Sequence, residues 1–241
     1  LHYRLRVSMN KLRYINSNGF DQGLPSGRYF VFPLHTLPES STLTMSTEYF
    51  EADLIRFLSK ELPVGVHLAV KENANMVGER FWSFYEEVRR LPNVVLLDPV
   101  VPMRKLIIGS VGVIGISGTA LLEAVLLRRP AHCFGEPEFK QVLNSHGHAT
   151  LPRFIRDCLH GRAIPKRRMA LRHLAYVVEH GERIDIRALK KPGRVDQGPS
   201  VRSLVGILEA EMATTERLEP HRSEPDPDEV GHRRISYESS R

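Results

Sequence analysis

The stretch GVIGISGTALLEAVLLRRPAHCFG, residues 112–135, predicts a buried strand, a tight polar turn, a helix and a second buried strand. Residues 113–116 carry no charge and are rich in β-branched side chains, which is typical of a parallel strand covered on both faces. Small residues follow at 117–119, and residues 120–129 are good helix formers with one apolar face. Pro130 ends that helix because it cannot continue the hydrogen-bond pattern.

The same alternation of strand and helix extends to both sides of this stretch. Strands are expected at residues 28–34, 66–70, 94–97, 113–116 and 131–134. Helices are expected between them, at residues 48–62, 79–90, 103–108 and 120–129. Antiparallel hairpins would need connections of only about two to five residues. The longer helical connections therefore predict an α/β fold with a doubly wound, Rossmann-like parallel sheet.

Polar residues follow several of the predicted strands. In open parallel sheets, ligands bind outside the carboxyl ends of the strands, so we expect these residues to converge on one edge. They are His35 with Glu39, Lys71 with Glu72 and Asn73, Ser117 with Gly118 and Thr119, and Gly135 with Glu136. A small-residue turn before a helix favours anions. The alternative interpretation is a purely structural turn with Thr119 as the helix cap.

Composition excludes several classes of protein. Hydrophobic residues make up 41% and charged residues 26% of the 241 residues, as in ordinary globular proteins. No apolar run approaches the roughly 20 residues that span a bilayer, and the first residues contain no signal-peptide core. The two cysteines, Cys133 and Cys158, form no motif and suit a reducing compartment.

The net charge of +6 is concentrated in a basic segment at residues 153–194. This segment lacks the interleaved aromatic residues of single-strand binders and matches no nucleic-acid-binding motif. We therefore expect a solvated helical face and no nucleic-acid partner. His146 and His148 have no third metal ligand at a suitable spacing, so no metal is expected there.

Three blocks of sequence, in this order, resemble the capsular polysaccharide biosynthesis family. They are FPLHTLPESSTL, VKENANMVGERFWSFYEEVRRLPNVVLLDP and ISGTALLEAVLLRRPAHCFGEPEF, and the resemblance covers about residues 28 to 145. Members of this family are similar to GT-B glycosyltransferases of bacterial surface carbohydrates, including those that transfer Kdo. In GT-B enzymes two Rossmann-like domains face each other, and the C-terminal one typically holds the nucleotide-sugar donor.

The resemblance implies that this chain is the C-terminal half of such an enzyme. Residues 1–27 would be a lead-in from a missing N-terminal half, and residues 28–190 would form the nucleotide-sugar-binding domain. Residues 191–218 would be a linker and helix, and the polar residues 219–241 a disordered tail. The implied location is cytoplasmic, with peripheral contact to the inner membrane or to capsule export machinery.

Residues of the third block would hold the donor. Ser117, Gly118 and Thr119 would offer backbone N–H groups and hydroxyls to a phosphate. Glu123 lies one helical turn beyond Thr119 and would accept hydrogen bonds from ribose or sugar hydroxyls. The alternatives for Glu123 are a capping-box partner and a solvated side chain.

The second block supplies Lys71, Glu72 and Asn73. Lys71 would neutralise phosphate charge, and Glu72 would orient Lys71 or bind a donor hydroxyl. Asn73 can donate to a phosphate or a base but cannot shuttle protons as histidine does. The family has proline where this chain has Ala74, which puts the loop geometry in doubt. A surface ion pair is the alternative for Lys71 and Glu72.

The first block carries the two predicted catalytic residues, His35 and Glu39. A histidine at this edge can bind phosphate or act in acid–base chemistry, and the alternative is a hydrogen bond that stabilises the loop. Leu37 departs from the glutamine expected by resemblance. In the second block, Arg80 is expected as a solvated charge, and the aromatic residues after it, Trp82, Phe84 and Tyr85, as core packing.

The sequence therefore predicts the donor-binding half of a glycosyltransferase that builds a capsular or other surface polysaccharide. Its partners would be a nucleotide-sugar donor and a glycan or glycolipid acceptor, and it would need no cofactor or metal. Two alternatives remain open. One is a non-catalytic GT-B module in a capsule synthesis or export complex, and the other is a nucleotide-sugar epimerase of similar fold.

Overall fold

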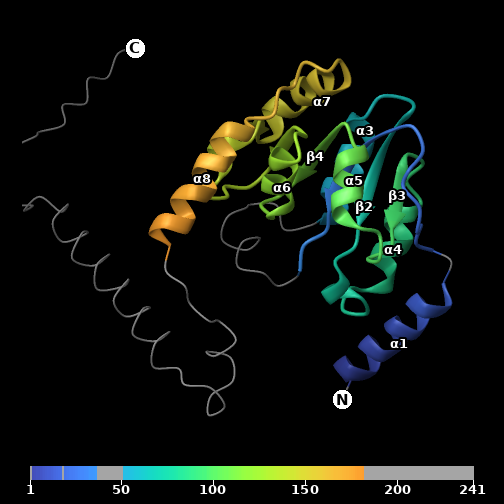
Figure 1. The fold of residues 1–241 in the computed structure, drawn as a ribbon. Helices are drawn as coiled ribbons and strands as arrows, with labels where there is room; N and C mark the ends of the chain where they lie inside the picture. The colour runs from blue at the N-terminus through green and yellow to red at the C-terminus, as the bar shows by residue number, and fades with distance from the viewer. Residues whose placement is uncertain (1, 18, 37–50, 182–241) are drawn as a thin grey trace, which may run out of the picture. The chain divides into compact units, whose positions relative to one another are not determined.

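The computed structural model describes residues 2–17, 19–36 and 51–181 of the chain (Figure 1). Residues Leu1–Glu179 form one compact unit, and a second unit, His180–Arg241, falls almost entirely outside the described residues. The predictions for Glu39 and for residues 191–241 also concern residues outside that description. None of the helices in the described ranges is long and apolar enough to cross a membrane.

A six-stranded sheet forms the centre of the first unit, with the order β3-β2-β1-β4-β5-β6. The strands are β1 Arg28–Pro33, β2 Val66–Lys71, β3 Val94–Leu97, β4 Gly112–Gly115, β5 Ala131–Cys133 and β6 Ser145–His146. Each neighbouring pair is parallel. The predicted Rossmann-like parallel sheet is therefore confirmed. The short β6 was not predicted, because two residues carry no periodic pattern.

Helices connect the strands close to the predicted positions. The connecting helices are α3 Glu51–Glu61, α4 Trp82–Arg89, α5 Met103–Gly109 and α6 Ala120–Leu126. Helix α1 His2–Asn16 precedes β1, and helices α7 Leu151–Leu159 and α8 Arg167–His180 follow β6. Helix α6 ends three residues before its predicted end. Arg128 adopts a φ of 62°, a left-handed conformation that turns the chain toward β5 before Pro130 is reached.

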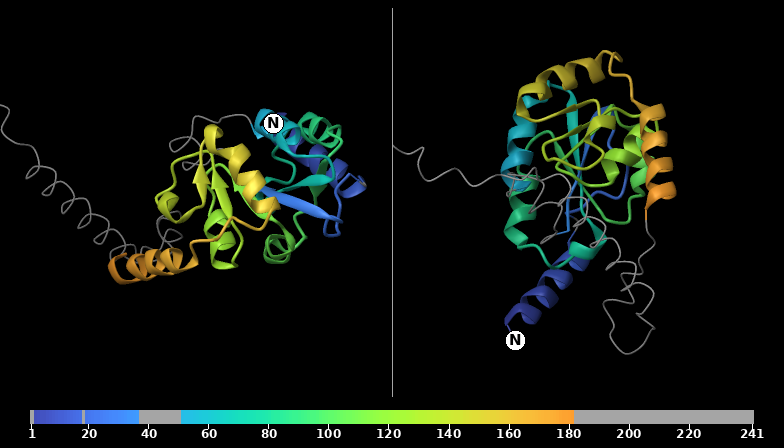
Figure 2. Two further views of the ribbon diagram at one scale, coloured as in Figure 1. Left: turned by 90° about the horizontal axis from the view of Figure 1, so that it is seen from above. Right: turned by 90° about the vertical axis from the view of Figure 1, so that its left-hand side faces the viewer.

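The two faces of the sheet are covered by different helices (Figure 2). Along β1, Phe30 and Phe32 enter the core shared with α3, α4 and α7, whereas Tyr29 and Val31 enter the core shared with α5, α6 and α8. This alternation follows from the two-residue period of a strand. Both faces are apolar, which explains the nearly uncharged strand sequences.

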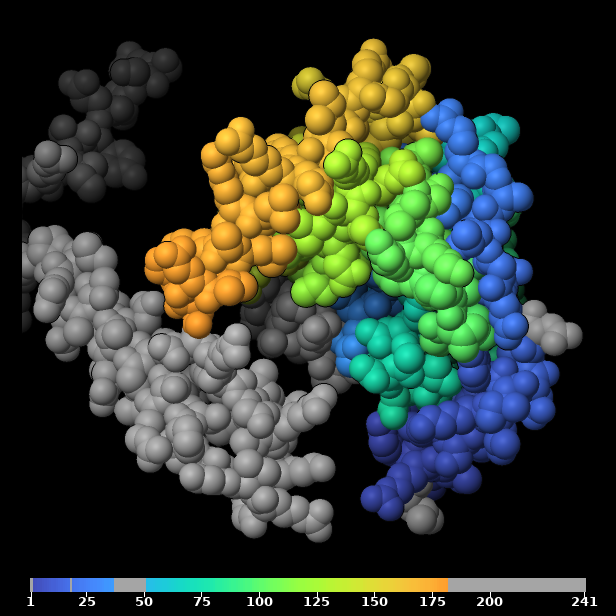
Figure 3. Space-filling view, in the orientation of Figure 1, coloured from blue at the N-terminus to red at the C-terminus, as the bar shows by residue number. Residues whose placement is uncertain are grey.

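Helix α1 packs against the loop that precedes α4, as its dark blue surface in Figure 3 shows. The Asn10 side chain donates to the carbonyl oxygens of Gly78 at 3.2 Å and Arg80 at 2.9 Å. Gly78 has a φ of 86°, and a Cβ there would lie 2.9 Å from the Val7 carbonyl oxygen. Glycine at this position therefore allows both the turn and the close approach of α1.

Candidate functional site

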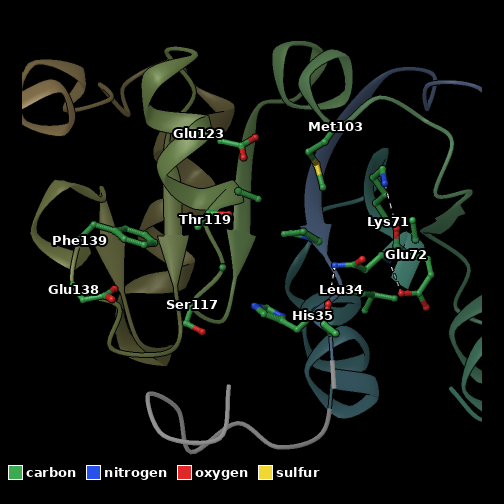
Figure 4. A pocket seen from close by; sticks show the side chains of 16 residues that line it. Leu34, His35, Lys71, Glu72, Met103, Ser117, Thr119, Glu123, Glu138 and Phe139 are labelled. Carbon is green, nitrogen blue, oxygen red and sulfur yellow. Dashed lines mark hydrogen bonds between the residues drawn. The ribbon is translucent and has the colours of Figure 1, made fainter. Parts of the chain in front are cut away.

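A pocket of about 540 Å³ lies at the carboxyl edge of the sheet (Figure 4). It lies beyond β1 and β4, the neighbouring strands at which the strand order reverses, where open α/β sheets bind ligands. Every predicted site residue that the structure describes lines it: His35, Lys71, Glu72, Asn73, Ser117, Gly118, Thr119 and Glu123. The parallel register thus brings together residues from three separate strand ends.

His35 follows β1 and has only 5% of its surface exposed. Its backbone N–H donates to Glu51 Oε1 at 2.8 Å, and its ring Nδ1 lies 3.3 Å from the same oxygen. The other ring nitrogen, Nε2, is buried and has no hydrogen-bond partner among the described residues. Figure 4 shows the ring directed toward the turn that carries Ser117 and Thr119.

Arg80 is not the solvated charge that the sequence suggested, because only 7% of its surface is exposed. Its Nη1 lies 2.5 Å from Glu51 Oε2, and its Nε lies 2.9 Å from Glu72 Oε2. Its Nη2 donates to the carbonyl oxygen of His35. One guanidinium thus joins the residues that follow β1 and β2 to helix α3, using the rigid donor fork of arginine.

Glu51 was not singled out from the sequence, although a signal for it was present. It lies on the same face of α3 as the buried residues Leu54, Ile55 and Leu58. A carboxylate on an apolar helical face must be paired, because an isolated buried charge is too costly. Burial raises the pKa of the Glu51 carboxyl, but hydrogen bonds from His35 and the charge of Arg80 outweigh burial and leave that pKa below its ordinary value.

Glu72 is 1% exposed, and its carboxylate accepts hydrogen bonds from other groups of the protein. Besides Arg80, it accepts hydrogen bonds from the Tyr85 hydroxyl at 2.6 Å and from the Asn73 backbone N–H at 2.6 Å. Burial is the largest effect on its pKa, which lies above the ordinary value although Arg80 acts in the opposite direction. A surface ion pair with Lys71 is therefore not what this residue forms, and its role toward a ligand stays a prediction.

Lys71 and Asn73 shape the wall of the pocket next to β2. The Lys71 ammonium donates to the carbonyl oxygens of Glu72 at 3.2 Å and Pro99 at 3.1 Å, and burial lowers the pKa of Lys71. The Asn73 amide donates to Thr36 Oγ1 at 3.0 Å, which connects the loops after β1 and β2. These two carbonyl oxygens use two of the three ammonium donors of Lys71.

The turn after β4 forms the opposite wall. Thr119 occupies the N-cap position of α6, but its side chain makes no capping hydrogen bond. The side-chain cap that the alternative interpretation assigned to Thr119 is thus absent, and its role toward a ligand stays a prediction. Glu123 lies in the first turn of α6 and lines the same wall. Gly118 lies close to His35, since a Cβ at position 118 would be 3.2 Å from His35 Nε2.

Among the lining residues that were not predicted, Met103, Glu138 and Phe139 lie away from the predicted blocks of site residues. Met103 begins α5, and the other two follow β5, where the sequence pointed to Gly135 and Glu136 instead. The aromatic residues of α4 match their prediction as core packing. Tyr85 is 2% exposed, and Trp82 and Phe84 pack against the same core.

The pocket combines one buried lysine, hydroxyl groups and three acidic side chains, of which Glu72 is paired within the protein and Glu123 and Glu138 are not in its network. Such a set can hold a ligand that carries both negative charge and hydroxyl groups, because cations attract anions while carboxylates accept hydrogen bonds from hydroxyls. Among the residues that the structure describes, no group of three His, Cys, Asp or Glu side chains is arranged to hold a metal ion.

Comparisons with known proteins found similarity in structure only. No protein-family model and no curated protein matches the sequence. Among solved structures, Thermosulfurimonas dismutans KpsC, a beta Kdo 2,7 transferase, is 12% identical, with a TM-score of 0.41 over 71% of this chain and 61% of that chain. The S. aureus MnaA–UDP structure is 10% identical, with a TM-score of 0.39 over 71% of this chain and 53% of that one.

The glycosyltransferase SnogD from Streptomyces nogalater is 14% identical, with a TM-score of 0.35 over 64% of this chain and 45% of that chain. The chain thus spans between 45% and 61% of the length of these three structures. At such low identities and TM-scores, these similarities establish no shared activity.

Proposed function

We propose that this chain is the nucleotide-sugar-binding half of a GT-B glycosyltransferase that builds a bacterial capsule or a related surface polysaccharide. One observation carries the proposal. The residues predicted for donor binding and catalysis come from three distant sequence blocks, and those that the structure describes line a single pocket where the strand order reverses. A pocket in this position is the expected ligand site of the fold.

The donor would lie across the pocket between its two walls. Its phosphates would face Lys71 and the backbone of residues 117–119, which offer positive charge and N–H donors. Its ribose or sugar hydroxyls would face the carboxylates of Glu123 and Glu138. These groups would stabilise the departing nucleotide without a bound metal. The acceptor and the general base would come from a second domain.

Two other functions are weighed against this one. A non-catalytic module that kept the fold is favoured by Ala74, which replaces the proline of the family, and by Glu72, whose carboxylate is occupied by the protein itself. Such a module would bind donors weakly or not at all. An epimerase of similar fold would bind the donor and invert one carbon of its sugar, which NMR of the incubated nucleotide-sugar detects directly.

Isothermal titration of the chain with a panel of UDP- and CMP-sugars tests the proposal. We expect at least one donor to bind, and Thr119→Val and Glu123→Gln each to weaken that binding about tenfold, the loss of about 1.4 kcal/mol. Glu136→Gln is the matched control, because Glu136 follows the neighbouring strand β5 but is exposed and does not line the pocket. No heat with any donor, or equal effects in all three variants, would contradict the proposal.

The proposal includes contact between the chain and an anionic membrane surface. Helix α1 contains no acidic residue, and it exposes the basic residues Arg4, Lys11 and Arg13 beside the apolar Leu12 and Ile15. Basic and apolar side chains on one helix suit the boundary between lipid headgroups and acyl chains. Cosedimentation with phosphatidylglycerol vesicles but not with phosphatidylcholine vesicles is the expected result. If the chain binds neither kind of vesicle, the proposed membrane contact is wrong.

A further inference from the structure

We infer that Glu51 is a positioning residue that fixes the His35 ring with its proton on Nδ1, so that the bare Nε2 accepts a hydrogen bond from a hydroxyl group of the bound ligand. The inference deepens the proposed function and rests on it for the identity of that ligand. It also bears on the phosphate-binding role that the sequence left open for His35, because a bare Nε2 cannot donate to a phosphate.

The first step concerns the side of the ring that faces Glu51. A carboxylate can only accept hydrogen bonds, so the 3.3 Å contact between His35 Nδ1 and Glu51 Oε1 places the proton on Nδ1. The same oxygen accepts the backbone N–H of His35 at 2.8 Å. Two donors of one residue thus meet one oxygen, which fixes both the backbone and the ring of His35.

The second step concerns the carboxylate itself, which is not free to turn. Its other oxygen, Oε2, lies 2.5 Å from Arg80 Nη1, and Arg80 also donates to the His35 carbonyl oxygen. Arg80 is held in turn by Glu72, which accepts the Tyr85 hydroxyl. A buried network in which each charge has partners is rigid, and here it ends on one ring of the pocket.

The third step concerns the side of the ring that faces the pocket. The side chain of His35 is only 4% exposed, and Nε2 has no hydrogen-bond partner among the described residues. Leaving a buried polar atom unpaired costs free energy, and such atoms often mark a place where a ligand supplies the partner. Gly118 lies close to this nitrogen, since a Cβ at position 118 would be 3.2 Å from Nε2.

The chemistry of Nε2 then selects the ligand group. With the proton on Nδ1, the neutral ring has only a lone pair to offer at Nε2, and phosphate oxygens also have only lone pairs. A ribose or sugar hydroxyl can donate to it. The phosphates are left to Lys71 and the turn at residues 117–119, which offer donors.

Nitrogen-15 NMR of the histidine rings in the full chain reads the tautomer directly, at a pH about two units above the ordinary imidazole pKa of roughly 6.5. The His35 signals are assigned by their loss in His35→Gln. We expect a protonated Nδ1 and a bare Nε2. A proton on Nε2 in the unaltered chain would overturn the inference, and this outcome requires no variant to fold.

Two matched variants separate positioning from general stability. Glu51→Met and Glu72→Met each remove one of the two ion pairs of Arg80, but only Glu51 touches His35. We expect the Nδ1-protonated form to persist in Glu72→Met and to give way to a mixture of both tautomers in Glu51→Met. If both variants change the tautomer alike, or neither does, Glu51 is not the positioning residue.

Ligand titration in the same experiment tests the hydroxyl contact. The probes are UDP, which offers ribose hydroxyls, and UDP-glucose, which adds sugar hydroxyls, together with CMP and a CMP-sugar. We expect a bound probe to shift the Nε2 resonance while the proton stays on Nδ1. A ring protonated on both nitrogens in the complex would indicate phosphate contact and overturn this part. If no probe binds, the proposed function fails with the ligand assignment, whereas the tautomer in the free chain still decides the role of Glu51.

Discussion

Gly118 shows how much one atom can matter in this pocket. Its backbone does not adopt a left-handed conformation, so alanine is acceptable to the chain itself. The added methyl group would lie 3.2 Å from His35 Nε2, which is a tight contact, and 3.7 Å from His35 Cδ2, which is an ordinary van der Waals contact. The methyl group would therefore fill the space in which a ligand meets the ring.

We predict that Gly118→Ala weakens donor binding at least tenfold, about 1.4 kcal/mol, while thermal unfolding changes little. Gly23→Ala is the matched control, because a Cβ at Gly23 has nothing within 4 Å. Calorimetric titration and a thermal melt of both variants provide the measurement. Unchanged binding in Gly118→Ala would mean that the ligand does not use the space between Gly118 and His35.

The site residues at strand ends were predictable from the sequence, whereas the residues that hold them in place were not. His35, Lys71 and Thr119 follow strands that the pattern locates, and parallel strands share one carboxyl edge. Glu51 and Arg80 act through partners 8 to 45 residues away, and no local pattern reveals such pairs. Arg80 therefore looked solvated in the sequence although the fold buries it.

At the scale of elements, Arg80 connects α3 and β2 at one end of the sheet. It is paired with Glu51 of α3 and with Glu72 after β2, and both carboxylates are buried. Without the guanidinium, two negative charges would face each other away from water. Removing one partner of a buried ion pair leaves an uncompensated charge, which is far more costly than losing an exposed pair.

We predict that Arg80→Met lowers the free energy of unfolding by about 3 to 5 kcal/mol. Arg56→Met is the control, because Arg56 also bonds two carboxylates, Asp53 and Glu87, but its side chain is 44% exposed. Its expected cost is below about 1 kcal/mol. Urea unfolding of both variants measures the difference, and equal costs would show that the buried network does not hold these elements together.

Strand β5 contains His132, a buried titratable residue whose pKa differs between the folded and the unfolded chain. His132 is fully buried; burial, assisted by the charges of His146 and His148, lowers the pKa of His132 to about 3. In the unfolded chain the pKa returns to about 6.5. Between these two values the unfolded state binds the proton and the folded state does not, so stability falls as the pH falls through this window.

We predict that His132 costs the folded chain about 2 kcal/mol at pH 5 relative to pH 7.5. Other groups titrate as well, so the comparison is between the unaltered chain and His132→Gln, which keeps a polar side chain without the titration. Urea unfolding measures how much the free energy of unfolding falls from pH 7.5 to pH 5. This decrease should be smaller by about 2 kcal/mol in the variant. Equal losses in both proteins would contradict the assignment.

At the scale of the whole molecule, the parallel sheet was predictable because five nearly uncharged strands alternate with amphipathic helices. Element boundaries were less so. Helix α6 ends at Leu126 because Arg128 takes a left-handed conformation. The turn into β5 requires this conformation, and helix propensity does not reveal it. The pocket walls at Met103 and Phe139 also depend on how whole elements pack, which strand patterns alone do not specify.

The central claim is that a nucleotide-sugar occupies the pocket between the ends of β1 and β4, and backbone amide shift mapping tests it most directly. On titration of the nitrogen-15-labelled chain with UDP- and CMP-sugars, the largest changes should fall on residues 34–36, 71–74 and 117–123, which lie at the ends of the three strands β1, β2 and β4. Changes confined to other surfaces, such as the groove beside α1, would contradict the account, as would none at saturating donor.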